Sequence, residues 1–212
     1  MKKTCAKEAL KYIKNKSIIG LGGGSTISYL VSFIKENKLD VEIVTPSFNT
    51  EKLCRENNLK VLDISSVSEV LVAFDGCDEI DYDLNALKSC GGIHTKEKIV
   101  ATMAKDYILL VDESKVSKTL QFNYPVVLEI IPESKSIVEK SVKQLDGKVR
   151  MRNDKLMEVY FDKKDIKGIK KLDEDLRKIV GVIETSLFHD IATKAIVVGE
   201  NRIKLIECEK GD

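Results

Sequence analysis

The sequence is short of the residues on which several kinds of functional site depend. It has no tryptophan, three prolines and only two histidines, His94 and His189. A metal site would therefore have to consist mostly of carboxylates, and a histidine-dependent catalytic triad has few candidate members. A serine hydrolase of the G-x-S-x-G type is also excluded, because that pattern does not occur.

The cysteines lack the spacing of a disulfide framework or a zinc site. Their number is odd and no C-x-x-C pair occurs; they are Cys5, Cys54, Cys77, Cys90 and Cys208. Such a set is typical of reduced thiols in a cytosolic protein.

An excess of charge of one sign is also missing. The chain has 35 basic and 34 acidic residues, which are well mixed, and a net charge of +1. No segment stands out as a nucleic-acid or membrane surface. No apolar run approaches the ~20 residues that span a bilayer, and the N-terminus has no signal-peptide stretch. We expect a cytoplasmic protein with neither a nucleic-acid partner nor a membrane partner.

What the sequence does contain is strand alternating with helix. Apolar strand patterns cover 17–22, 41–46, 59–64, 68–75 and 107–112, and helical patterns cover 4–16, 25–37, 49–57 and 96–106. This alternation is typical of βαβ units. It predicts an α/β fold with an open, mostly parallel, Rossmann-like sheet and helices on both faces.

The pattern changes after Tyr124-Pro125. Strand and helix patterns then follow in a denser βαββαβ order up to "VIETSLF". We interpret 126–190 as a small α+β (ferredoxin-like) lobe. "KAIVVGE" and "RIKLIE" are expected to return to the main domain as an edge hairpin, so that this domain comprises 1–125 and 191–212.

The segment "GLGGGST" follows a strand and opens a helix. Backbone amides and the helix dipole in such a turn attract a phosphate or another anion. A dinucleotide fingerprint is not met, because Ser25 stands at the third glycine position and the next strand ends without an acid at Thr45. A tight turn with a serine cap remains the alternative.

Charged residues follow several of the predicted strands. Asp75 and Asp78 end one strand, Lys88 and Glu97 come next in the sequence, and Lys115 follows a later strand. In an open parallel sheet, ligands bind at the carboxyl ends of the strands. Carboxylates and a lysine at one rim suit proton transfer beside the carbonyl of a sugar phosphate, without a metal or cofactor.

Each of these residues also has a structural interpretation. Glu97 could complement a helix N-terminus, the lysines could be solvated, and the acids of "DGCDEIDYD" could form a polar turn. A calcium loop is disfavoured because Gly76 stands second rather than sixth in the run. We expect Glu79, Asp81 and Asp83 to belong to the turn and the surface.

Taken together, the motifs resemble those of the ribose-5-phosphate isomerase A family. "GGGST" resembles its G-T-G-S-T phosphate loop, "FDGCDEID" its D-G-A-D-E motif, "LKSCGGIHTKEKIVA" its K-G-G-G motif with the following E-K-I, and "VDESK" its D-x-S-K. "VLEIIP" and "GVIETSLF" also match in order and spacing. The resemblance covers nearly the whole chain.

The resemblance implies interconversion of ribose 5-phosphate and ribulose 5-phosphate in the non-oxidative pentose phosphate pathway. Glu97 would move the proton between the two carbons, Lys88 would stabilise the enediolate oxygen, and Asp75 would assist ring opening. The phosphate would be held by Gly23, Gly24, Ser25 and Thr26, which we call the phosphate turn, with the aid of Lys115 and of Lys2 near the N-terminus. The implied substrate-binding residues are Gly23, Gly24, Ser25, Thr26, Asp75, Gly76, Cys77, Asp78, Lys88, Ser89, Cys90, Gly91 and Lys115. The resemblance also implies a homodimer or homotetramer and no metal or cofactor.

The chain departs from the family pattern at several positions. Gly23 replaces a threonine, Ser89 and Cys90 replace two glycines, and Ser186 stands where glycine is usual. The T-D-N-G-N hairpin segment is replaced by "MRNDKLMEVYFDK". The alternatives are a related sugar-phosphate isomerase or deaminase of similar fold, and a sensor that binds a sugar phosphate without turnover.

Overall fold

The computed structural model describes residues 1–207, which divide into two compact units. The first unit consists of residues 1–77, 96–116 and 191–207, and the second of residues 78–95 and 117–190. The sequence-based division placed 78–95 and 117–125 in the main domain, whereas here they pack with the second unit. Residues 208–212, with Cys208, lie outside the described residues.

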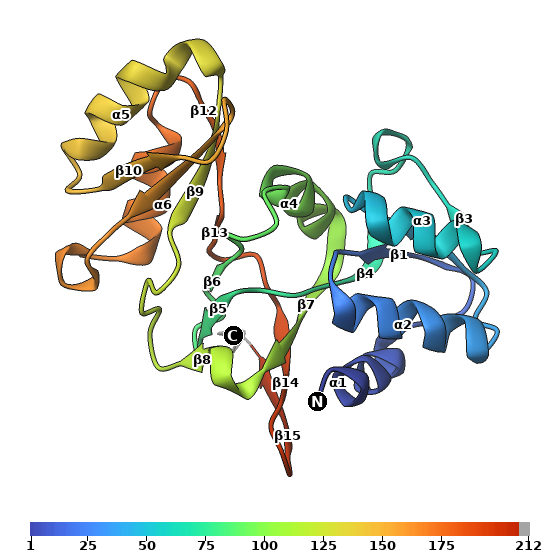
Figure 1. Cartoon of the computed structure of the whole chain (residues 1–212). Coiled ribbons are helices and arrows are strands. Elements are labelled where there is room, and N and C mark those ends of the chain that lie inside the picture. Colours follow the sequence, from blue (N-terminus) through green and yellow to red (C-terminus); the bar gives the residue numbers. More distant parts are fainter. Residues whose placement is uncertain (208–212) are drawn as a thin grey trace. The chain divides into compact units, whose positions relative to one another are not determined.

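The first unit is built on a seven-stranded sheet of order β15-β14-β7-β4-β1-β2-β3 (Figure 1). β15 is antiparallel to β14, and the other neighbouring pairs are parallel. This confirms the predicted sheet and its edge hairpin. The strands are β1 (Ser17–Leu21), β2 (Val41–Val44), β3 (Lys60–Val61), β4 (Val70–Asp75), β7 (Ala104–Asp112), β14 (Lys194–Val198) and β15 (Ile203–Glu207).

Helices cover both faces of this sheet. Successive residues of a strand point to opposite faces, so one strand contacts helices on both sides. Ile19 and Leu21 of β1 join a buried cluster with residues of α1 (Lys2–Ala9), α2 (Ser25–Glu36) and α3 (Phe48–Glu56). Gly20 points the other way, and a Cβ there would lie 2.7 Å from Val100 of α4 (His94–Met103). The absence of a side chain at Gly20 lets α4 approach closely. The short 3₁₀ turns of this unit are η1 (Leu10–Tyr12), η2 (Ile64–Ser66) and η3 (Glu113–Lys115).

The second unit contains the predicted ferredoxin-like lobe. Its four-stranded antiparallel sheet has the order β10-β11-β9-β12. Val138 and Leu176, from its two helices, pack with Val126 and Leu128 in one buried cluster. The elements in chain order are β9 (Val126–Ile130), η4 (Pro132–Ser134), α5 (Lys135–Lys143), β10 (Lys148–Met151), β11 (Leu156–Tyr160), η5 (Lys163–Asp165), α6 (Ile169–Arg177) and β12 (Val182–Thr185).

A further small sheet was not predicted from the sequence. Its order is β13-β6-β5-β8, and its strands are β5 (Glu79–Asp81), β6 (Ala86–Leu87), β8 (Val116–Ser117) and β13 (Leu187–Phe188). Strands of two or three residues are too short to show an alternating pattern, and therefore they could not be recognised from the sequence.

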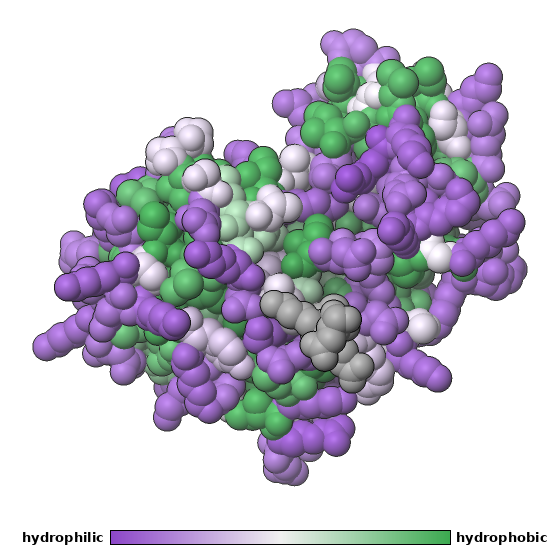
Figure 2. All heavy atoms as spheres, turned by 180° about the vertical axis from the view of Figure 1, so that it is seen from behind, coloured by the Kyte–Doolittle hydropathy of each residue, from purple (hydrophilic) through white to green (hydrophobic). Residues whose placement is uncertain are grey.

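Hydrophilic side chains cover much of the face drawn in Figure 2, in keeping with a charged fraction of 33%. Within residues 1–207, the structure has no helix that combines the length and the apolar character needed to cross a membrane.

Candidate active site

The glycine turn between β1 and α2 leaves the start of the helix uncapped by any side chain. Gly24 is the N-cap residue, and its φ of 90° lies in the left-handed region that favours glycine. Ser25 is the first residue of the helix and not its cap, so the serine-cap interpretation is wrong. Open amides at the positive end of a helix dipole favour an anion, and the geometry supports the phosphate interpretation.

Asp75 ends β4 beside this turn. The amides of Gly23 and Gly76 donate hydrogen bonds to its Oδ1, over 3.3 Å and 2.8 Å. These two donors fix the orientation of the carboxylate.

Tyr107 on β7 contacts the same carboxylate, although it was not among the predicted site residues. Its hydroxyl donates to Oδ2 of Asp75 over 3.5 Å. Burial, followed by the negative charges of Asp75 and Glu97, raises the pKa of Tyr107 well above its ordinary value. Tyr107 therefore remains a neutral donor near both carboxylates. A tyrosine inside a buried strand was the available signal, since its hydroxyl needs a partner there.

Glu97 lies in the first turn of α4 and is 7% exposed. A carboxylate shielded from water in this way is suited to accept a proton from carbon. Its place at a helix N-terminus also fits the structural interpretation, because the helix dipole favours negative charge there.

Lys115 on η3 lies close to the phosphate turn. Its Nζ donates to the carbonyl oxygen of Cys77 over 2.7 Å. Lys115, Lys2 and Thr26 line one small cavity of about 50 Å³. The two lysines assigned to the phosphate turn thus lie near one of its residues, Thr26.

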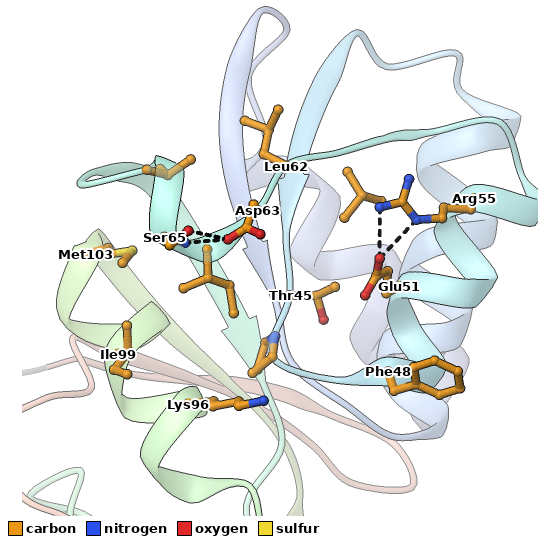
Figure 3. Close-up of a pocket in the computed structure, with 14 residues that line it drawn as sticks. Thr45, Phe48, Glu51, Arg55, Leu62, Asp63, Ser65, Lys96, Ile99 and Met103 are labelled. Carbon is orange, nitrogen blue, oxygen red and sulfur yellow. Dashed lines mark hydrogen bonds and ion pairs between the residues drawn. The ribbon is translucent and has the colours of Figure 1, made fainter.

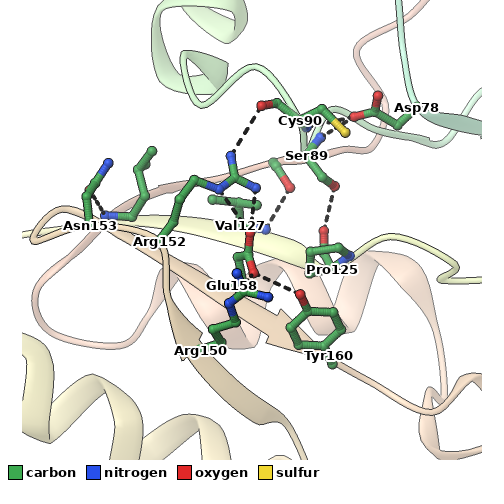
Figure 4. Close-up of polar contacts among 12 residues, drawn as sticks. Asp78, Ser89, Cys90, Pro125, Val127, Arg150, Arg152, Asn153, Glu158 and Tyr160 are labelled. Atoms are coloured by element: carbon green, nitrogen blue, oxygen red, sulfur yellow. Dashed lines mark hydrogen bonds and ion pairs between the residues drawn. The ribbon is translucent and has the colours of Figure 1, made fainter.

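In the second unit, the turn after Lys88 folds around Asp78 (Figure 4). Oδ2 of Asp78 accepts hydrogen bonds from the amides of Ser89, over 2.7 Å, and Cys90, over 2.9 Å. The hydroxyl of Ser89 donates to the carbonyl of Pro125 over 2.5 Å. We call residues 88–92 the substrate turn, because four of them, Lys88, Ser89, Cys90 and Gly91, are predicted to bind the substrate.

Lys88 is buried and makes contacts with Phe188 and Ser186. Its Nζ lies 5.7 Å from the centre of the Phe188 ring, and its backbone amide donates to the carbonyl of Ser186 over 3.0 Å. The hydroxyl of Ser186 accepts the amide of Val127 over 2.8 Å. Ser186, one of the departures from the family pattern, thus has a structural role.

The expectation that the remaining acids lie at the surface is wrong for two of the three. Asp83 is exposed, but Glu79 and Asp81 are buried rather than on the surface. Glu79 accepts backbone amides from residues 121–123, and Asp81 accepts the amide of Asn85 over 2.9 Å. Burial raises the pKa of Asp81. These two acids organise the local fold of the second unit.

A larger cavity of about 680 Å³ in the first unit contains none of the predicted site residues (Figure 3). Three of its charged groups already have partners, since Arg55 contacts Glu51 at 2.8 Å and Asp63 accepts the amide of Ser65 at 2.8 Å. We assign this cavity no role in the reaction. Within residues 1–207, no cluster of three or more His, Cys, Asp or Glu side chains is arranged to hold a metal ion.

The predicted site residues are thus divided between the two units. The first holds the glycine turn, Asp75, Gly76, Cys77, Glu97 and Lys115, and the second holds Asp78 and residues 88–91.

Comparison with known proteins matches residues 42–202 to the family model of ribose 5-phosphate isomerase A (phosphoriboisomerase A). The ribose-5-phosphate isomerase A of Pyrococcus abyssi is 35% identical over 98% of this chain and 97% of its own length. That of Prochlorococcus marinus strain MIT 9312 is 32% identical over 93% of this chain and 90% of its own.

Solved structures show the same relationship. Ribose 5-phosphate isomerase A from Methanocaldococcus jannaschii superposes with a TM-score of 0.87, at 29% identity and 97% coverage of both chains. A D-ribose-5-phosphate isomerase in complex with phospho-erythronic acid gives a TM-score of 0.89, at 31% identity and 97% coverage of both chains. The chain therefore belongs to the ribose 5-phosphate isomerase A family and is an isomerase of sugar phosphates in the pentose phosphate pathway.

Proposed function

We propose that this isomerase interconverts ribose 5-phosphate and ribulose 5-phosphate through an enediolate, with Glu97 as the base. The observation that carries the proposal is a buried carboxylate at Glu97 whose charge acts on Tyr107, beside a second carboxylate at Asp75. One carboxylate can then take the proton from carbon while the other handles a hydroxyl proton.

The phosphate of the substrate is assigned to the turn formed by Gly23, Gly24, Ser25 and Thr26. The uncapped start of α2 supports this, because its amides and dipole suit an anion. Lys115 adds positive charge near the same turn. A relative bound to phospho-erythronic acid, a phosphorylated sugar acid, is consistent with such a ligand.

Asp75 is assigned to ring opening, and its fixed orientation supports that role. Lys88 is assigned to the enediolate oxygen, because a buried ammonium stabilises negative charge that develops during the reaction. Asp78 and the substrate turn would bind the sugar hydroxyls. The proposed steps move protons only and need no metal or cofactor.

The enzyme is further proposed to be a cytoplasmic homodimer or homotetramer. Four free cysteines among the described residues support a reducing compartment. Ile203 and Leu205 on the edge strand β15 are 48% and 41% exposed. Apolar side chains on an open sheet edge suit contact with a second copy of the chain.

The test is a coupled assay for ketose formation from ribose 5-phosphate in the presence of EDTA. The Glu97→Gln variant should lose on the order of a thousandfold or more in kcat and still bind substrate, because general acid–base catalysis contributes factors of this size. Glu69→Gln is the matched control, since Glu69 forms an exposed ion pair with Lys105. Near-normal turnover by Glu97→Gln would show that Glu97 is not the base. If the unchanged protein formed no ketose, the whole proposal would be contradicted.

A further inference from the structure

Arg152 contacts the substrate turn from the side opposite Asp78. It follows β10, in the hairpin that stands in place of the family's T-D-N-G-N segment. Its Nη1 donates to the carbonyl oxygen of Cys90 over 3.3 Å (Figure 4). The amide of the same residue, Cys90, donates to Asp78 over 2.9 Å. Cys90 is therefore held through both its backbone polar groups.

The guanidinium of Arg152 is also held by an ion pair with Glu158. Its Nε and Nη2 contact Oε1 of Glu158 at 2.9 Å and 2.8 Å. Glu158 also accepts the hydroxyl of Tyr160 over 2.8 Å. Because the guanidinium is planar and two of its nitrogens are held by Glu158, the third nitrogen, Nη1, points in a defined direction.

The backbone of the hairpin is equally well defined. The amide of Arg152 donates to the carbonyl of Leu156 over 2.9 Å, and Oδ1 of Asn153 accepts the amides of Lys155 and Leu156, each over 2.9 Å. The hairpin also packs against the end of the turn. A Cβ on Gly92, whose φ is +66°, would lie 2.9 Å from Leu156 and 3.5 Å from Nη1 of Arg152.

Fixing the carbonyl of Cys90 has a consequence for the next residue. The peptide group is planar, so the direction of the Cys90 carbonyl also sets the direction of the Gly91 N–H. Gly91 and Cys90 are both among the proposed sugar-binding residues. Lys88, at the start of the turn, has contacts of its own, to the Ser186 carbonyl and the Phe188 ring.

We propose that Arg152 is a positioning residue for the substrate, which sets the backbone of the turn at Cys90 and Gly91 through its hydrogen bond to the Cys90 carbonyl. This rests on the proposed role of residues 88–91 in binding the sugar. Because the turn binds hydroxyls in the ground state and the transition state alike, loss of the contact should raise KM more than it lowers kcat.

The test compares Arg152→Lys with Arg150→Lys. A lysine at position 152 can keep the ion pair with Glu158, but it lacks the planar fork that reaches two partners at once. Arg150 is the matched control, because it contacts the same carboxylate at 3.7 Å and makes no hydrogen bond to the turn in the described part of the chain.

Arg152→Lys should raise KM for ribose 5-phosphate about tenfold, as expected for one hydrogen bond from a charged group, with kcat within about threefold. Hydrogen exchange at the amides of Ser89 and Cys90 should accelerate by a similar factor. Arg150→Lys should match the unchanged protein in both measurements. Arg152→Lys with unchanged KM and exchange would overturn the proposal. If the unchanged protein formed no ketose, the proposed function would fail, and the exchange rates would still decide whether Arg152 holds the turn.

Discussion

Gly22 and Asp75 pack so closely that no side chain fits between them. A Cβ built on Gly22 would lie 2.0 Å from both Cγ and Oδ1 of Asp75. The amide of Gly22 also donates to the carbonyl of Phe74 over 2.8 Å, which ties the turn to β4. The phosphate turn and the proposed ring-opening carboxylate therefore depend on each other's position.

Gly22→Ala should lower kcat/KM for ribose 5-phosphate by about a hundredfold, because misplacement of a catalytic group by about an ångström has effects of this order. Steady-state kinetics measure the loss. Gly168→Ala is the control: nothing lies within 4 Å of a Cβ there, and its φ of 169° is ordinary extended backbone. Equal kinetics for the two variants would contradict the dependence of Asp75 on Gly22.

The parts of the fold and site that were predicted depend on local patterns. The strand, glycine run and helix around Gly24 are contiguous, and so their geometry could be expected from sequence alone. The same holds for the βαββαβ order of the lobe, whose strands and helices are long enough to show their periods.

The parts that were missed depend on contacts between distant segments. Glu79 follows a strand among other acids and looked solvated, but residues 121–123 supply amides that bury it. Tyr107 meets Asp75 only because β4 and β7 are neighbours in the sheet. Arg152 reaches Cys90 across 62 positions of sequence. No short window of sequence contains such pairs.

Ser89→Ala should destabilise the second unit. The Ser89 hydroxyl is buried and donates to the Pro125 carbonyl, so its removal leaves that acceptor without this donor. We expect a loss of about 1–3 kcal/mol in the free energy of unfolding, measured by urea denaturation. Ser141→Ala removes an exposed hydrogen bond from the Ser141 hydroxyl to the carbonyl of Ile137 and should change the free energy of unfolding little. Equal stability for both variants would show that the Ser89 contact contributes nothing.

The ion pair of Glu158 should make stability depend on acid pH. Burial by itself would raise the pKa of Glu158, but hydrogen bonds from Tyr160 and Arg152 outweigh it and hold the pKa below its ordinary value of 4.5. The unfolded chain therefore binds the proton at a higher pH than the native one. The stabilisation is complete above the ordinary pKa and is lost as pH falls through the folded one.

Glu158→Gln should accordingly be less stable than the unchanged protein at neutral pH, by about 1–2 kcal/mol for charge-assisted hydrogen bonds. The difference should shrink as unfolding is measured at progressively lower pH below 4.5, because the carboxyl of the unchanged protein takes up its proton only there. Glu139→Gln, which changes a partly exposed acid paired with Lys143, is the control and should alter stability little at either pH. A difference that stayed constant with pH would mean that the charge of Glu158 is not what stabilises the lobe.

The thiols should differ sharply in reactivity, and the difference reports on the substrate turn. Cys5 and Cys54 are buried, and burial raises the pKa of each to about 11, so neither forms much thiolate near neutral pH. Cys77 is also buried, whereas Cys90 is exposed. In a Cys208→Ser background, a thiol reagent near pH 8 should therefore modify one residue quickly, which is Cys90.

Ribose 5-phosphate should slow that fast phase, because Cys90 lies in the turn proposed to bind the sugar. Ribose without phosphate is the matched ligand control and should protect less, since the glycine turn contributes phosphate affinity. Adding Cys90→Ser should remove the fast phase, and adding Cys54→Ser should leave it intact. A fast phase that survived Cys90→Ser would contradict the assignment of the reactive thiol, and one unaffected by saturating ribose 5-phosphate would place the sugar away from Cys90.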